Sequence, residues 1–213
     1  MTRCGVGHPG APERRGETYR TLDDQPGRLS AGEERFEASD SRTVDHLRNS
    51  QPNRVLAAVL FSDIAGSTAR AVALGDHRWT ELLDQHDEVA RRCVERYEGR
   101  VIKRLGDGAL AIFPRPSLAV EAACAIRRLL HPVDLRLRFG IHTGEVQLRQ
   151  GDVAGVAVHV AQRVARLAPP GEILVSATVK DLVLGNGFAF RCGGRHSLPG
   201  IPGRWALFAV RQQ

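Results

Sequence analysis

Apolar residues along the chain change from a strand-like to a helix-like pattern after residue 62. The run Arg54–Ser62 is almost continuously apolar, which predicts a buried strand. Apolar residues then recur at spacings of three and four from Trp79 to Tyr97, which predicts an amphipathic helix ending at Gly99. Two short apolar runs flank Gly106-Asp107-Gly108, and this arrangement is typical of a β-hairpin.

The remaining elements follow from the same two periodicities. The hairpin strands and the later helices and strands are predicted at Arg100–Leu105, Ala109–Phe113, Ser117–Leu130, Leu135–Leu148, Val156–Leu167, Glu172–Ser176, Ala177–Leu184, Phe188–Arg191 and Ala206–Val210. The order is β-α-β-β-α-β followed by α-β-α-β-β. It predicts an α+β fold with a ferredoxin-like βαββαβ core and a C-terminal αβ extension.

Residues 1–54 differ from the rest of the chain. They are rich in Gly, Pro, Arg, Glu, Asp and Ser, which predicts a disordered tail or linker before a folded domain at 55–213. No run approaches the roughly 18 apolar residues of a membrane span, and the N-terminus lacks the apolar segment of a secretory signal. The scattered cysteines form no Cys-x-x-Cys pair, so no zinc site is indicated. A cytoplasmic location is therefore expected.

The net charge of +6 lies in the residues after 54, because residues 1–54 carry nine Arg and nine Asp or Glu. A basic domain suits a polyanionic ligand such as a nucleotide or a nucleic acid. Solvated surface arginines explain the same charge equally well. Aromatic residues make up only 5% of the chain, and the predicted strands offer no exposed aromatic pair for base stacking, so a nucleic-acid partner is disfavoured.

The stretch FSDIAGST, residues 61–68, is the first candidate for chemistry. Its strand ends on Asp63, and the small-residue turn that follows offers free N–H groups to an anion. Asp63 alone is more often an ordinary helix cap. Asp107 lies in the hairpin turn beside the first strand, so the two carboxylates can face one another and form a two-metal site for phosphoryl chemistry. Taken alone, Asp107 is an ordinary turn residue.

Three further stretches follow FSDIAGST in order. They are KRLGDG at 103–108, RFGIHTGE at 138–145 and DVAGVAVHVAQR at 152–163. Together the four resemble the catalytic domain of class III nucleotide cyclases, the adenylate and guanylate cyclases, and the closing segment resembles bacterial members with a short arm. The resemblance covers residues 55–210 or so. It implies the nucleotide cyclase fold and an adenylate cyclase that converts ATP to cyclic AMP and pyrophosphate in a head-to-tail homodimer.

The resemblance also implies a role for each matching residue. Asp63 and Asp107 match the two metal-binding aspartates of the family, and the Ile64 carbonyl matches its third ligand. Two Mg²⁺ or Mn²⁺ ions per active site are implied. The loop that holds the β- and γ-phosphates in the family corresponds here to the turn that includes Gly66, Ser67 and Thr68.

Nucleotide recognition is implied for three more residues. Arg138 matches an arginine that contacts the phosphates, and a fork-shaped permanent cation suits that role, although in isolation it is equally a solvent-facing strand residue. Lys103 and Asp152 match the pair that reads the purine. A lysine can donate to adenine N1 and an aspartate can accept from the adenine amine, whereas guanine presents the opposite pattern. ATP is therefore expected over GTP, while in isolation both residues would be surface charges.

Two departures from the family pattern concern the catalytic end of the site. Arg163 matches the arginine that stabilises the α-phosphate in the transition state. Four residues earlier His159 replaces the usual asparagine that orients the ribose, and this spacing places both side chains on one helix face. The hairpin Leu198–Arg204 lacks the lysine that many relatives carry there, so either Arg204, its one cation, substitutes for it or the contact is absent. The alternative function is therefore a catalytically weak or inactive module that binds nucleotide and acts in regulation.

Overall fold

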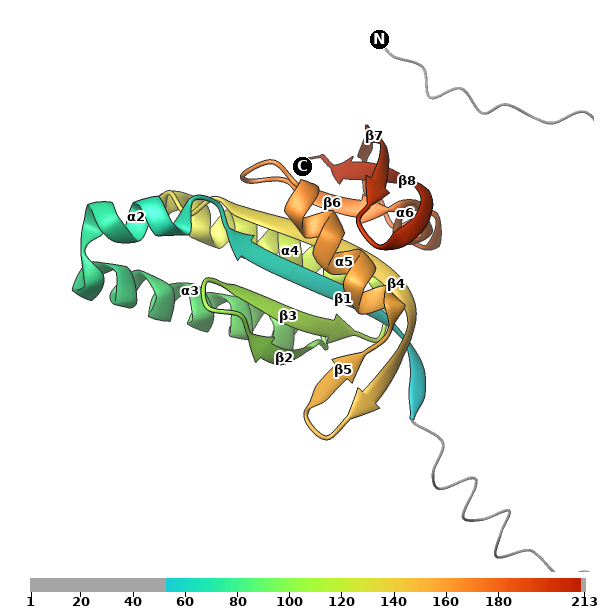
Figure 1. Cartoon of the computed structure of the whole chain (residues 1–213), viewed down its shortest axis with the longest axis horizontal. Helices are drawn as coiled ribbons and strands as arrows, with labels where there is room; N and C mark the ends of the chain where they lie inside the picture. The colour runs from blue at the N-terminus through green and yellow to red at the C-terminus, as the bar shows by residue number, and fades with distance from the viewer. Residues whose placement is uncertain (1–52, 212–213) are drawn as a thin grey trace, which may run out of the picture. The chain divides into compact units, whose positions relative to one another are not determined.

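A computed structural model of the chain describes residues 53–211, in which eight strands form one sheet with helices on both faces (Figure 1). The strands are β1 (Arg54–Ile64), β2 (Arg100–Arg104), β3 (Gly108–Phe113), β4 (Leu137–Arg149), β5 (Asp152–Ala154), β6 (Ile173–Ser176), β7 (Phe190–Leu198) and β8 (Ile201–Val210). The helices are α2 (Ser67–Leu74), α3 (Asp76–Arg96), α4 (Pro116–Leu130), α5 (Val156–Leu167), α6 (Ala177–Leu182) and the 3₁₀ turn His131–Val133. The prediction of a tail over residues 1–54 lies outside the described residues except for 53 and 54, and it stays a prediction.

The sheet confirms the predicted fold class. Its strand order is β2-β3-β1-β4-β6-β8-β7, with β5 paired to β4. The first four strands stand in the order β4-β1-β3-β2 with antiparallel neighbours, which is the ferredoxin-like arrangement. After α5 the chain returns as β6, parallel to β4, and the hairpin β7–β8 completes the extension. None of the described helices is long and apolar enough to span a membrane.

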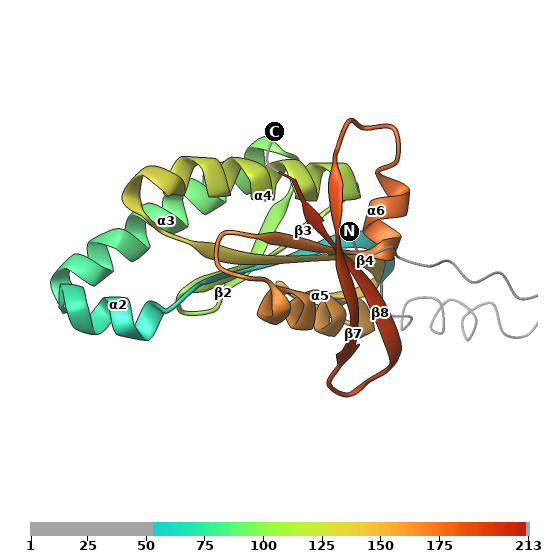
Figure 2. The ribbon, with the colours of Figure 1, turned by 90° about the horizontal axis from the view of Figure 1, so that it is seen from above.

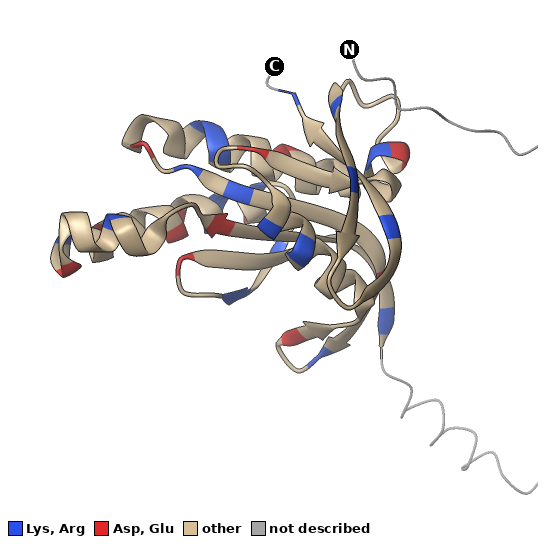
Figure 3. Cartoon of the chain, turned by 45° about the horizontal axis from the view of Figure 1, so that its top comes forward, with Lys and Arg blue, Asp and Glu red and all other residues tan. Residues whose placement is uncertain are grey.

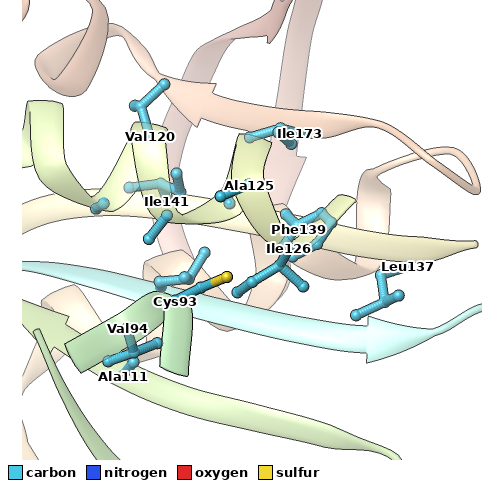
Figure 4. Close-up of a cluster of buried hydrophobic side chains, with 14 of the residues drawn as sticks. Cys93, Val94, Ala111, Val120, Ala125, Ile126, Leu137, Phe139, Ile141 and Ile173 are labelled. Carbon is cyan, nitrogen blue, oxygen red and sulfur yellow. The ribbon is translucent and has the colours of Figure 1, made fainter. Parts of the chain in front are cut away.

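Two helix layers bury the centre of the sheet, as the view from above makes clear (Figure 2). On one face, α3 and α4 pack in a core that includes Cys93, Ile126 and Phe139 (Figure 4). On the other face, α5 lies against β1 and β4, with small residues such as Ala161 in contact with Phe61 and its neighbours. Because both faces of β1 are covered, its apolar run is continuous rather than alternating.

Four strands differ from the prediction. The strand expected at Leu135–Leu148 reads in the sequence as alternating between apolar and polar positions, but the first half of β4 is buried almost throughout and only its second half alternates. The closing strands are longer than predicted, because β7 and β8 pair along most of their length with a register shift between Cys192 and Gly194. The three-residue strand β5 was not predicted at all, since so short a segment carries no periodicity.

Candidate active site

Asp63 and Asp107, here called the acidic pair, lie where β1 ends. Asp63 is the register partner of Gly108 on β3, directly after Asp107. The Ile64 N–H donates to the Asp107 carbonyl oxygen at 3.2 Å, which ties the hairpin turn to the end of β1. A Cβ atom at Gly108 would lie 2.1 Å from the Ser62 carbonyl oxygen, so only glycine permits this approach. The backbone therefore brings together the two predicted metal-binding residues.

Like charge sets the electrostatics of the acidic pair. The pKa of Asp63 is raised above its ordinary value, first by partial burial of the carboxyl and then by the negative charge of Asp107, with a hydrogen bond between the two side chains adding to the effect. Arg138 and Arg166 act in the opposite direction and lower this pKa. Arg138 faces Asp63 directly, as its register partner on β4. The pair is thus a site of excess negative charge with two cations near it.

The oxygen atoms at the end of β1 suit a small divalent cation. Two carboxylates and the adjacent Ile64 carbonyl offer oxygen ligands, which Mg²⁺ and Mn²⁺ prefer. Among the described residues no group of three or more His, Cys, Asp or Glu side chains is arranged to hold a metal. A metal here would accordingly depend on few protein ligands and on a substrate's phosphates, which is the usual arrangement for Mg²⁺. Binding a cation would also relieve the repulsion that raises the pKa of Asp63.

The predicted phosphate loop lies directly beyond the acidic pair. Gly66 precedes α2 in the left-handed conformation, with φ of 70°, and within the described chain no side chain caps this helix. The first N–H groups of a helix have no partner inside it, so those of Ser67 and Thr68 are available to an anion. The Nε of Arg138 is buried and lacks a hydrogen-bond partner among the described residues. N–H groups without hydrogen-bond partners therefore lie on two sides of Asp63: on its register partner Arg138 and at the start of α2.

Lys103 and Asp152, here called the reader pair, form an ion pair between β2 and β5. Lys103 Nζ lies 2.9 Å from Asp152 Oδ2, and both side chains remain about half exposed. The other carboxylate oxygen accepts from the Val153 N–H at 2.7 Å. The hydrogen bond from Lys103 is the main reason why the pKa of Asp152 is lowered, and Arg149 adds to it. Asp63 is the register partner of Arg138 near the start of β4, whereas Asp152 is the partner of Arg149 at its end, so the two pairs lie toward opposite ends of that strand.

Helix α5 presents His159 and Arg163 on its exposed side. The Arg163 guanidinium donates from Nε to the Pro199 carbonyl oxygen, in the turn between β7 and β8, and from Nη1 to the His159 carbonyl oxygen at 3.3 Å. Pro199 cannot replace the missing lysine, but its carbonyl oxygen accepts a hydrogen bond that holds Arg163 in place. Arg204 instead donates to the Arg195 carbonyl oxygen within its own hairpin, at 3.1 Å.

Sequence reasoning missed two of these features. Arg166 was not considered, although it stands seven residues after His159 and three after Arg163, a spacing that places all three on one helix side. The contact of Arg163 with Pro199 carries no sequence signal, because the acceptor is a backbone carbonyl. Figure 3 shows basic and acidic positions interspersed over the ribbon, so charge alone does not mark the site.

The chain resembles a known protein family and several solved structures. The family described as the adenylate and guanylate cyclase catalytic domain matches residues 50–212. The chain belongs to this family. The likeness extends to solved structures: the adenylyl cyclase CyaB from P. aeruginosa aligns with a TM-score of 0.71 at 22% identity, over 76% of this chain and 97% of that one. At this identity the comparison shows the shared cyclase fold.

Two relatives of this cyclase-family chain come from Mycobacterium tuberculosis. An uncharacterized protein is 40% identical over 160 residues, which cover 68% of this chain and 52% of the relative. A pH-sensitive adenylate cyclase is 34% identical over 170 residues, covering 76% of this chain and 42% of the relative. The chain therefore spans about half the length of these relatives.

Proposed function

We propose that this chain is an adenylate cyclase that works as a head-to-tail homodimer with Mg²⁺ or Mn²⁺. The observation that carries the proposal is the presence, in one cyclase-family chain, of both an acidic pair and a reader pair. The acidic pair suits cations and phosphates, and the reader pair suits the edge of a purine. A nucleoside triphosphate needs both.

ATP specificity rests on the chemistry of the reader pair. Lys103 is a donor and Asp152 an acceptor, and their polar atoms stand 2.9 Å apart at the surface. Adenine offers an acceptor at N1 beside a donor amine, so it can accept a hydrogen bond from Lys103 and donate one to Asp152 at the same time. Guanine offers a donor at N1 beside the O6 acceptor and would meet a like group at each position. ATP should therefore be preferred over GTP.

The reaction is an intramolecular phosphoryl transfer. The ribose 3′-hydroxyl loses its proton to water, its oxygen bonds to the α-phosphorus, and the bond from that phosphorus to the bridging oxygen breaks, so that pyrophosphate leaves. Divalent ions held by Asp63, Asp107 and the Ile64 carbonyl would acidify the 3′-hydroxyl and neutralise the leaving group. The N–H groups of Ser67 and Thr68, together with Arg138, would hold the β- and γ-phosphates. Arg163 would stabilise the added charge on the α-phosphate.

A homodimer is proposed because the two pairs are separate within one chain. The charges near Asp63 are Asp107, Arg138 and Arg166, whereas those near Asp152 are Lys103 and Arg149. In a head-to-tail dimer the acidic pair of one subunit would meet the reader pair of the other, which gives two equivalent sites. Each isolated subunit would hold only half-sites.

The proposal is tested with purified protein, ATP and Mn²⁺, with cyclic AMP measured by chromatography. The wild type should form cyclic AMP, and Asp63→Ala should not. GTP should be a poorer substrate than ATP. Absence of product with either ion and either nucleotide would refute the cyclase activity, and a preference for GTP would refute the assignment of the reader pair.

A second candidate function is a regulatory module that binds ATP without converting it. It is favoured by His159 at the position of the usual asparagine, and by a β7–β8 turn that offers a Pro199 carbonyl instead of a lysine. The imidazole is larger than the amide and can carry a charge, so the ribose could be held in an unproductive position. ATP binding without cyclic AMP formation would favour this function. His159→Asn should then restore activity, because it returns the family's residue.

A further inference from the structure

One side of α5 carries a stripe of three polar residues. His159, Arg163 and Arg166 follow one another at spacings of four and three, whereas the opposite side buries Ala161 and Ala165 against the sheet. The family resemblance accounts for His159 and Arg163. Arg166 has no assigned role.

The direction of α5 shows where the stripe ends. A Cβ atom at Gly144 would lie 3.0 Å from Ala157 Cβ, near the start of the helix. A Cβ atom at Gly140 would lie 2.1 Å from the Ala165 nitrogen, near its end. The helix thus runs against the direction of β4 and therefore along β1, whose C-terminal end carries Asp63.

The strand register places Arg166 near the acidic pair of its own subunit. Gly140, beneath the last turn of α5, is the register partner of Phe61. Asp63 lies two residues further along β1 and so points to the same face of the sheet as Phe61. That face packs against α5, with Ala165 in the same cluster as Phe61. The residue after Ala165 is therefore at the helix end nearest Asp63.

Charge and hydrogen bonding agree with this placement. The positive charge of Arg166 is close enough to lower the pKa of Asp63. Arg163 is held by two carbonyl oxygens, whereas Arg166 makes no hydrogen bond or ion pair with any described residue. A guanidinium without a partner, at the helix end nearest Asp63, is available to bind an anion.

We infer that Arg166 binds the phosphates of a nucleotide held at the acidic pair of its own subunit, and so takes the place of the lysine that the β7–β8 hairpin lacks. This inference rests on the proposed binding of a nucleoside triphosphate. Its consequence is a division of labour along α5. Arg163 serves the site completed by the partner's acidic pair, whereas Arg166 serves the site of its own.

Direct binding tests the inference without relying on turnover. The probe is 3′-deoxy-ATP, which lacks the attacking hydroxyl, titrated with Mn²⁺ into each protein by calorimetry. Arg166→Ala should weaken binding roughly 10–100-fold, as expected for the loss of a charged hydrogen-bond donor. Arg166→Lys should lose less binding affinity than Arg166→Ala. Arg128→Ala, an exposed arginine on α4 across the sheet, is the matched control and should bind like the wild type. An Arg166→Ala affinity within about twofold of the wild type would refute the inference.

Mixed dimers test which site Arg166 serves. Two differently tagged subunits are co-expressed and purified through both tags, and cyclic AMP formation is measured. Asp63→Ala with Arg163→Ala should regain activity, because one of the two sites is intact. Asp63→Ala with Arg166→Ala should stay inactive or weak, because the intact acidic pair then lacks Arg166. Arg163→Ala with Arg166→Ala should regain activity, and the reverse pattern would refute the inference.

The two experiments separate this inference from the proposed function. A wild type that binds 3′-deoxy-ATP but forms no cyclic AMP refutes the cyclase activity, while the binding series still decides on Arg166. A wild type that binds no 3′-deoxy-ATP refutes both. A normal cyclase whose Arg166→Ala variant binds and turns over normally refutes the inference alone.

Discussion

The acidic pair brings two like charges together, whereas the reader pair joins two opposite charges. At the end of β1, Asp63 and Asp107 bring like charges together, and the pKa of Asp63 is raised. Between β2 and β5, Lys103 and Asp152 neutralise each other at 2.9 Å, and the pKa of Asp152 is lowered. The first arrangement would gain from a bound cation, whereas the second is satisfied already and would have to open to admit the purine of the proposed substrate. One pair is therefore expected to drive binding, and the other to select what binds.

The largest expected effect is on the acidic pair. Asp107→Asn should lower the rate of cyclic AMP formation by about 10²–10³-fold, because a preorganised electrostatic contact in the transition state is lost. Initial rates at saturating ATP and Mn²⁺ measure the effect. Asp181→Asn, an exposed aspartate on α6, is the control and should leave the rate unchanged. A near-normal rate for Asp107→Asn would remove the distinction between the two pairs.

The next effect concerns selection by the reader pair. The double variant Lys103→Asp with Asp152→Lys keeps the ion pair but exchanges donor and acceptor. Its kcat/KM for ATP should fall roughly 10–100-fold, since each reader then faces a like group on adenine, while thermal stability changes little.

A matched control exchanges another ion pair of the same length. Arg191 and Glu172 also lie 2.9 Å apart, and neither is among the charges that shift the pKa of Asp63 or of Asp152. The variant Arg191→Glu with Glu172→Arg should keep the wild-type preference for ATP. If the exchange of the reader pair also kept that preference, base selection would have to come from other residues.

The pKa values of Asp63 and Asp152 are expected to be shifted in opposite directions. NMR of carboxyl carbons should give a midpoint above the ordinary value for Asp63 and below it for Asp152. Mg²⁺ should move the Asp63 midpoint down, because a cation favours the ionised form, and should leave Asp152 nearly unchanged. Added salt should raise the Asp152 midpoint by screening its contact with Lys103. Shifts in the same direction for both residues would contradict the comparison.

The sequence predicted the fold well wherever local pattern and tertiary environment agree. The bounds of α5, Val156–Leu167, were predicted in full, because its apolar face meets the sheet along its whole length. The parts of β7 and β8 next to their hairpin turn, residues 192–198 and 201–205, were missed. Gly193, Gly194, Pro202 and Gly203 break the local strand pattern, yet backbone pairing within the hairpin maintains the strands.

The candidate site was predictable to the extent that its residues lie in short motifs. FSDIAGST and KRLGDG indicated that Asp63 and Asp107 would meet, and the strand register brings them together. The role argued for Arg166 depends on which strand end lies below the last turn of α5, and this is a tertiary fact. The hydrogen bond from Arg163 to the Pro199 carbonyl oxygen likewise joins segments far apart in the sequence.

The smallest expected effect is on stability in the absence of metal, and it has opposite signs for the two pairs. A raised pKa means that the folded state disfavours ionised Asp63, so its contribution to stability falls as pH rises through that pKa. Asp152 is the reverse: its stabilising contribution is present above the unfolded pKa and is lost as pH falls through the lowered one.

At pH 7 with a chelator, Asp63→Asn should therefore raise Tm by about 1–2 °C, the size of a solvent-screened charge contact. Asp152→Asn should lower it slightly. Mn²⁺ should stabilise the wild type more than Asp63→Asn, and a fall in Tm for metal-free Asp63→Asn would show that the acidic pair is not strained by its own charge.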